Sequence, residues 1–156
     1  REFISACDKG FQEAVREGRL IGFPIVGIRC TINDGESHDV DSSELAFKIA
    51  GSMAFRCGMA QASAVLLVPI MKVEVDTPDE HLGDVMGDLT SRRGRILGMD
   101  AKGSKQIVSA EVPLGGMFGY ATDLRSMTKG RASYAMEFEC YREVPKNVQE
   151  TIAEKK

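Results

Sequence analysis

A polar loop at residues 33–41 contains most of the side chains that could do chemistry in the first half of the chain. It contains His38, whose imidazole can serve as a base, stack on a nucleic-acid base or donate to a phosphate. The sequence holds only one other histidine, His81, which has no second histidine four residues away and no neighbouring cysteine. From the residues alone, His38 is interpreted as a solvated loop histidine and His81 as a surface or partly packed one.

The same loop is acidic, so we also consider a cation site. Five carboxylates could supply hard oxygen ligands, namely Asp34, Glu36, Asp39, Asp41 and Glu44. Their spacing does not match the pattern of a calcium-binding EF-hand loop. We therefore expect no metal site here.

The second half of the chain contains two basic clusters. Arg92, Arg93 and Arg95 form the densest positive group. Compensation of a helix dipole, about 0.3–1 kcal/mol for each residue, would account for one arginine but not for three. Guanidinium groups bind phosphates and carboxylates through paired hydrogen bonds, so the cluster predicts an RNA or interdomain contact. The second cluster ends a later helical segment and comprises Arg125, Lys129 and Arg131.

Composition limits the possible partners. The net charge is −3 at pH 7, and neither half is basic overall, so a nucleic acid would be held by local clusters rather than by a long-range field. No apolar run approaches the ~20 residues that cross a bilayer, and no secretory signal opens the chain. Four widely spaced cysteines form no C-x-x-C pair, which favours reduced core thiols. We expect a soluble cytoplasmic protein with no membrane partner.

The second half, from Ile70 to about Val144, changes its apolar period in the order strand, helix, strand, strand, helix, strand. The first strand places Val73 and Val75 on one face, and the following helix carries an apolar stripe at i, i+3, i+4 and i+7. A hairpin is expected around residues 102–104. The last strand is predicted to place four residues on one face, Tyr134, Met136, Phe138 and Cys140. This order predicts a split βαβ sandwich.

The first half predicts two helices, one near residues 3–18 and one following residue 43. The D-x-x-E spacing of Asp41 and Glu44 predicts a capping box at the second helix, and its many small residues suggest close packing on a sheet. A strand is expected over FPIVGIRCTI, and another is possible at residues 64–68. These strands are too few to cover both helices, so we expect that the chain begins inside a domain and leaves an open sheet edge, through which copies could self-associate.

Four strings together resemble the carboxy-terminal third of bacterial translation elongation factor G: DGESHDVDSSELAFKIAGSMAFR, VPIMKVEVDTP, MGDLTSRRGRILGMD and MFGYATDLRSMTKGRASYAMEFECY. The resemblance covers nearly the whole chain and implies an α+β protein. Residues 1–69 would form most of the fourth domain, a truncated ribosomal-protein-S5-like α/β unit. Residues 70–145 would form the fifth domain, a ferredoxin-like βαββαβ sandwich, and residues 146–156 a helical tail. Ribosome-protection proteins and the back-translocating elongation factor share the fifth-domain fold and remain paralogous alternatives.

The resemblance also implies a role for the polar loop. In the family this loop is the tip of the fourth domain, which enters the decoding site of the small ribosomal subunit and contacts tRNA and mRNA. The matching residues here are Asp34, Gly35, Ser37, His38 and Asp39. The loop's carboxylates disfavour tight phosphate binding and fit a wedge that acts by shape. Both basic clusters become candidate contacts to ribosomal RNA, with ribosomal proteins nearby.

No G-x-x-x-x-G-K-[ST] phosphate loop occurs in the sequence, so this chain is not expected to hydrolyse GTP and carries no cofactor of its own. GTP and magnesium would bind an amino-terminal domain of the longer factor that the resemblance implies, a translational GTPase. Two other classes of function compete with this reading. One is a small enzyme with His38 or His81 as its base, which lacks a partner nucleophile. The other is a free-standing RNA-binding or protein-interaction domain of ferredoxin-like fold.

Overall fold

The computed structural model describes residues 2–18 and 20–154, and the chain divides into two compact units. The first unit comprises Arg1–Leu66 together with Pro145–Lys156, and the second comprises Leu67–Val144. Helices and one antiparallel sheet make up the structure, so the α+β class is confirmed. In the described part of the chain, no helix combines the length and the apolar character that a membrane span requires.

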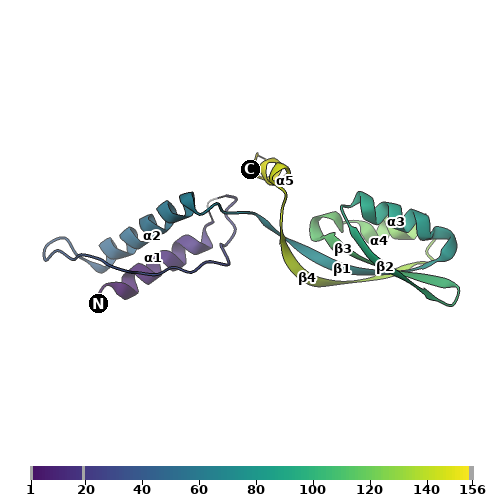
Figure 1. The fold of residues 1–156 in the computed structure, drawn as a ribbon, viewed down its shortest axis with the longest axis horizontal. Coiled ribbons are helices and arrows are strands. Elements are labelled where there is room, and N and C mark those ends of the chain that lie inside the picture. Colours follow the sequence, from purple (N-terminus) through teal and green to yellow (C-terminus); the bar gives the residue numbers. More distant parts are fainter. Residues whose placement is uncertain (1, 19, 155–156) are drawn as a thin grey trace. The chain divides into compact units, whose positions relative to one another are not determined.

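The second unit has the predicted order of a split βαβ sandwich (Figure 1). Its four-stranded antiparallel sheet has the order β2-β3-β1-β4, and α3 and α4 lie on the same face of it. Short 3₁₀ turns precede both helices. The elements are β1 (Leu67–Pro78), a turn at Asp79–His81, α3 (Leu82–Ser91), β2 (Arg95–Lys102), β3 (Lys105–Pro113), a turn at Leu114–Gly116, α4 (Tyr120–Met127) and β4 (Ser133–Glu143).

Alternation along the two central strands builds the core of this unit. Val73 and Val75 of β1 are fully buried, whereas the alternating residues Lys72 and Glu74 lie on the opposite face of the sheet. Each buried valine or leucine contributes about 1.5–3 kcal/mol relative to an exposed one. The helices close the core with the apolar stripe that the sequence predicted. The other fully or almost fully buried members are Val85, Leu89, Val108, Ala110, Val112, Tyr120 and Leu124.

The last strand departs from simple alternation. Phe138 pairs with Met71 and Cys140 pairs with Ile70, so Glu139 is an extra residue in a bulge. Phe138 therefore lies on the helix-covered side of the sheet, whereas Cys140 lies on the other side with Ile70. The expectation that Cys140 shares a face with Phe138 is wrong because a one-residue insertion shifts every later side chain to the opposite face.

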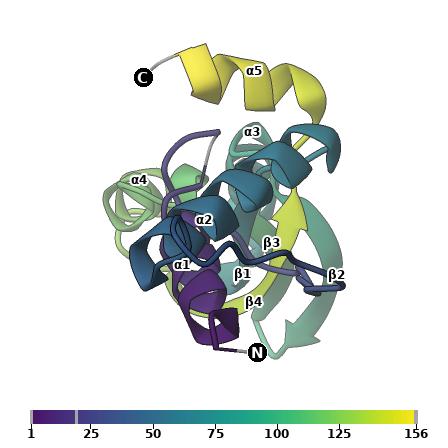
Figure 2. The ribbon, with the colours of Figure 1, turned by 90° about the vertical axis from the view of Figure 1, so that its left-hand side faces the viewer.

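In the first unit, α1 (Ile4–Arg16) and α2 (Glu44–Gln61) lie side by side (Figures 1 and 2). A methyl group added at Gly51 would come within 2.8 Å of the Cys7 carbonyl oxygen, and one at Gly10 would collide with the Lys48 carbonyl oxygen. The small residues of α2 thus serve close packing on another helix. Our expectation of packing on a sheet is not met among the described residues.

The strand expected over FPIVGIRCTI is not formed. Residues 24–32 run without secondary-structure pairing, apart from local bonds such as the one from the Ile25 N–H to the Val15 carbonyl at 2.8 Å. A β-branched run becomes a strand only where another strand accepts its backbone hydrogen bonds, and no strand of the described chain lies beside it. The prediction of a separate strand at residues 64–68 is also wrong. Residues 67 and 68 instead begin β1, which pairs with β4 in the second unit.

The start of α2 differs from the predicted capping box. The cap is Ser43, whose hydroxyl accepts the Ala46 N–H at 3.1 Å, while Asp41 lies in the turn before it. A serine at this position satisfies one orphan amide of the first turn directly. The chain ends its described part in α5 (Lys146–Glu154).

Candidate functional site

The polar loop ends in a tight turn that presents His38. The His38 N–H donates to the Ser42 hydroxyl at 2.7 Å, and the Ser42 N–H donates back to the His38 carbonyl at 3.0 Å. The next residue, Ser43, caps α2. The turn is therefore closed by reciprocal bonds and fixed to a helix start.

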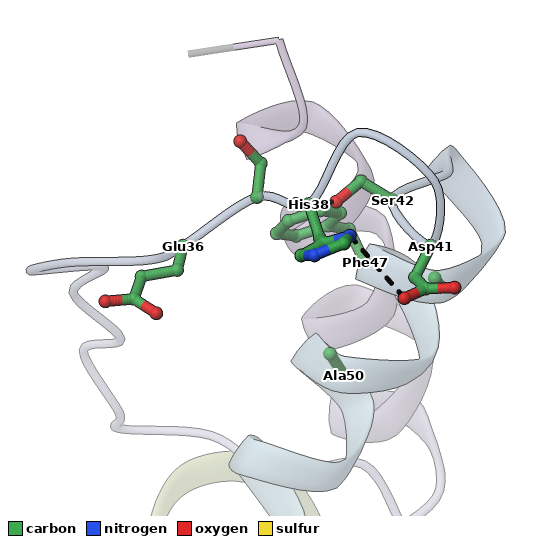
Figure 3. Close-up of a pocket in the computed structure, with 8 residues that line it drawn as sticks. Glu36, His38, Asp41, Ser42, Phe47 and Ala50 are labelled. Carbon is green, nitrogen blue, oxygen red and sulfur yellow. Dashed lines mark hydrogen bonds and ion pairs between the residues drawn. The ribbon is translucent and has the colours of Figure 1, made fainter.

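The His38 ring lies at the surface beside a carboxylate. Its Nδ1 is 3.6 Å from Asp41 Oδ2, and 75% of the His38 side chain is exposed. Figure 3 shows the ring turned toward Asp41, with Glu36 set apart from the pair. A carboxylate in this position limits the orientations of the ring.

A shallow hollow of about 280 Å³ lies below the turn. It is floored by Phe47 and Ala50 of α2, and Phe47 in turn stacks on Phe3 of α1 with ring centroids 4.4 Å apart. Phe47 thus lines the hollow and also takes part in the packing of α2 on α1. The polar members of its wall are Glu36, Ser37, His38, Asp41 and Ser42.

The other candidate residues of the loop are all exposed. The Asp34 side chain accepts the N–H of the next residue, Gly35, at 2.8 Å. Ser37 lines the hollow, whereas Asp39 is exposed and takes part in no ion pair among the described residues. Within the described ranges, no three histidine, cysteine or acidic residues are placed to hold a metal ion.

Arg92, at the end of α3, is held inside the second unit. Its guanidinium donates to Asp88 at 2.8 Å, to the Gly116 carbonyl at 2.7 Å and to Asp123, and only 13% of the side chain is exposed. It also lies 5.0 Å from the centroid of the Tyr120 ring. Burial alone would lower the Arg92 pKa, but the two carboxylates raise it above its ordinary value. The residue joins α3 to α4.

The three clustered arginines do not form one patch. Arg93 is exposed and adopts a left-handed backbone with φ of +63°. Arg95 lies on the opposite face of the sheet from the helices, where it donates to Glu111 at 3.0 Å. Arg142 donates to the same carboxylate at 2.8 Å. Although they are close in sequence, Arg92 and Arg95 therefore lie on different sides of the sheet.

The second basic cluster lies at the other end of the helix layer. Arg92 follows α3 and binds Asp123 in the first turn of α4, whereas Arg131 follows α4 and binds Glu80 just before α3. The two helices are therefore antiparallel. Arg131 also approaches His81 Nε2 at 3.0 Å. Arg125 and Lys129 are exposed, and no ion pair engages them within the described residues.

Sequence reasoning missed the partners of the basic residues. Asp88 could have been found, because it stands four residues before Arg92 on one helix face. Asp123 carried no such signal, since its pairing depends on how two helices dock. Thr128 was also missed, although its buried hydroxyl bonds the Leu124 carbonyl at 2.6 Å and accepts the Ala132 N–H at 3.3 Å. It closes α4 just before the second cluster.

Two family models match the chain. The model of elongation factor G, domain IV, matches residues 1–63, and that of the elongation factor G C-terminus matches residues 65–152. The chain belongs to the elongation factor G family. A crystal structure of a protein from Thermus thermophilus is similar with a TM-score of 0.86 and 44% identity over 99% of this chain.

This chain spans 23% of the length of that Thermus chain. The second unit, Leu67–Val144, lies within the C-terminus match, which also includes residues 145–152 of the first unit. The polar loop lies within the domain IV match, and both basic clusters lie within the C-terminus match. The family is one of translation elongation factors, whose work is protein biosynthesis.

Proposed function

We propose that this chain is the ribosome-binding arm of a translocation factor. In this proposal the His38 turn enters the decoding site and contacts the tRNA–mRNA pair as GTP-driven translocation proceeds. The observation that carries it is the exposed imidazole on a turn closed by Ser42 and anchored to the cap of α2, within a match to domain IV of elongation factor G. Such a turn holds its shape when it meets RNA.

The chemistry of the turn fits displacement rather than tight binding. Carboxylates at Asp34, Glu36, Asp39 and Asp41 repel phosphates, so the loop has little tendency to remain bound to an RNA backbone. The His38 ring can stack on an exposed base or donate to a ribose hydroxyl. Asp41, whose Oδ2 is 3.6 Å from His38 Nδ1, would hold the ring in one orientation. In this mechanism the arm prevents the tRNA–mRNA pair from slipping back.

For the second unit we propose contacts to ribosomal RNA through Arg93, Arg125 and Lys129. These three side chains are exposed and make no ion pair in the described part of the chain. Arg92, Arg95 and Arg131 already bind carboxylates of the same unit, so their first role is to hold the fold. Phosphate contacts by the free cations would position the arm without reading sequence.

The proposal includes a longer protein that acts in the cytoplasm, where ribosomes are. GTP and magnesium would bind a domain outside this chain, and the present residues would neither contact the nucleotide nor catalyse its hydrolysis. Ribosomal proteins and ribosomal RNA would be the partners of both units.

A free-standing RNA-binding sheet of the same fold is disfavoured by one observation. The sheet face opposite the helices carries paired charges, such as Lys72 with Glu74 and Arg95 with Glu111, and no aromatic ring among its paired central positions. Ferredoxin-like sheets that bind single-stranded RNA need aromatic rings there for base stacking.

The test is His38→Ala in the full-length factor. Translocation should slow severely while ribosome-stimulated GTP hydrolysis stays nearly intact, because the tip would act apart from the nucleotide. Lys102→Ala, in the β2–β3 hairpin, is the control and should leave both activities unchanged. Equal loss of translocation and hydrolysis in the His38 variant would contradict the assignment. Asp41→Asn should give a milder loss of translocation if the carboxylate orients the ring.

A further inference from the structure

The outer strand β4 combines an unpaired edge with exposed aromatic side chains. Its only neighbour among the described strands is β1, so every second residue of β4 directs its N–H and C=O away from the sheet. The bulge at Glu139 leaves the stretch from Ser133 to Phe138 uninterrupted. A backbone of this length can accept another strand.

The aromatic residues stand at one end of that stretch. The rings of Phe138 and Tyr141 have centroids 5.2 Å apart and are tilted by 59°. Phe138 is 53% exposed and Tyr141 64% exposed. Pairing with Met71 and Pro69 places both on the helix side of the sheet, yet neither belongs to the buried core. Two half-exposed rings in contact offer anchors for a partner's apolar side chain.

The charge around these rings is negative. Glu137, Glu139 and Glu143 are exposed on the same strand, and Glu137 makes only a 3.7 Å approach to Lys72. The ion pairs of the described residues include neither Glu139 nor Glu143. The one arginine of the strand, Arg142, is bound to Glu111. The edge therefore presents carboxylates with no compensating free cation on the strand.

We propose that β4 binds an extended, basic protein segment, which adds a fifth strand to the sheet along residues 133–138. Backbone bonds would supply affinity, an apolar side chain of the segment would pack on Phe138 and Tyr141, and its lysine or arginine residues would pair with Glu139 and Glu143. RNA does not fit, because its phosphates would face the carboxylates. A second copy of β4 does not fit either, because the same glutamates would meet each other.

The β4 residues used here differ from the His38 turn and from the exposed cations Arg93, Arg125 and Lys129, so the test is independent of the proposed function. The probe is a ten-residue peptide of alternating lysine and valine, added to the full 156-residue chain and followed by NMR shifts of backbone amides. The expected result is a set of shifts concentrated at residues 133–138. A glutamate–valine peptide, an N-methylated lysine–valine peptide and a uridine decamer should bind at least about tenfold more weakly.

Variants separate the anchors from the charges. Phe138→Ala with Tyr141→Ala should weaken the lysine–valine peptide by about tenfold or more, and both residues are exposed enough to be replaced without unfolding. Glu139→Lys with Glu143→Lys should reverse the preference toward the glutamate–valine peptide. Met99→Ala on the other edge strand is the control. Absence of binding, equal binding of the peptides, shifts on β2 or binding of the uridine decamer to β4 would each overturn the proposal.

Discussion

The guanidinium group of Arg92 donates to the carboxylate of Asp123, 31 residues further along the chain. The bond joins the end of α3 to the first turn of α4. The same guanidinium also binds Asp88 and the Gly116 carbonyl, so one side chain satisfies groups from three consecutive parts of the helix layer. Arg92, which the sequence analysis interpreted as a candidate RNA contact, thus connects α3 to α4 within the second unit.

Replacement of Arg92 should therefore destabilise the second unit. Arg92→Ala leaves Asp88 and the Gly116 carbonyl without their donor, and we expect the free energy of unfolding to fall by roughly 2–4 kcal/mol. The measurement is urea denaturation followed through amide signals of Val73 and Val108 in the buried core. Arg93→Ala, an exposed neighbour, should change stability by less than about 0.5 kcal/mol. Equal effects of the two variants would contradict the conclusion that the Arg92 contacts stabilise the second unit.

The salt dependence of ribosome binding should distinguish the free cations from the bound ones. Arg93→Ala, Arg125→Ala and Lys129→Ala in the full-length factor should each lower affinity and reduce the salt slope by about one ion. Arg95→Ala should change the slope less, because Arg95 already pairs with Glu111. If the three variants leave the slope unchanged, these side chains do not contact phosphates.

The fold of the second unit followed from the sequence because its period changes are local and complete. Val73 and Val75 alternate with Lys72 and Glu74, and the apolar residues of α3 recur at helical spacing. The buried face of each element can therefore be identified from its sequence. The bulge at Glu139 could not be predicted this way, since no residue type marks it. Its position is visible only in the pairing of β4 with β1.

The site was predicted less completely, for a physical reason. Residue type indicated that His38 and the arginines could bind RNA, but the partners of each side chain depend on docking between elements. Asp123 reaches Arg92 only because two helices are antiparallel, and Glu111 reaches Arg95 only across a strand pair. The first unit shows the same limit, because the run after Phe23 has strand-forming residues but no strand beside it among the described residues.

Acid should weaken the second unit through Glu111. The hydrogen bond from Arg142 lowers the Glu111 pKa below its ordinary value of 4.5, against the opposite effect of burial, and Arg95 adds to the lowering. Because the folded-state pKa is depressed, this stabilisation is complete above pH 4.5 and is lost as pH falls through the folded-state value. Glu111→Gln should flatten the stability profile below pH 4.5, and Arg142→Ala should do so more than Arg95→Ala. A profile unchanged by Glu111→Gln would contradict this account.

Close packing of the two long helices should make Gly10 intolerant of any side chain. A methyl group at Gly10 would collide with the Lys48 carbonyl oxygen, so Gly10→Ala should lower the free energy of unfolding of the first unit by about 1–3 kcal/mol. Gly58→Ala, in α2 with open space around it, should instead be neutral or stabilise by up to about 1 kcal/mol. Thermal unfolding monitored on helix signals would compare the two. Similar effects at both positions would mean that the contact does not limit packing.

The run at residues 24–32 should exchange its amide hydrogens rapidly in the monomeric chain. Its apolar side chains, among them Val26, Ile28 and Ile32, are exposed, and its backbone lacks strand pairing among the described residues. Amides of β1 and β3, in the middle of the sheet, should exchange slowly. Higher concentration should slow exchange at residues 24–32 if copies of the chain pair through this run, and sedimentation would then report a larger species. Slow exchange at residues 24–32 in the dilute monomer would show that the run is protected without a partner strand. That result would contradict self-association through this run.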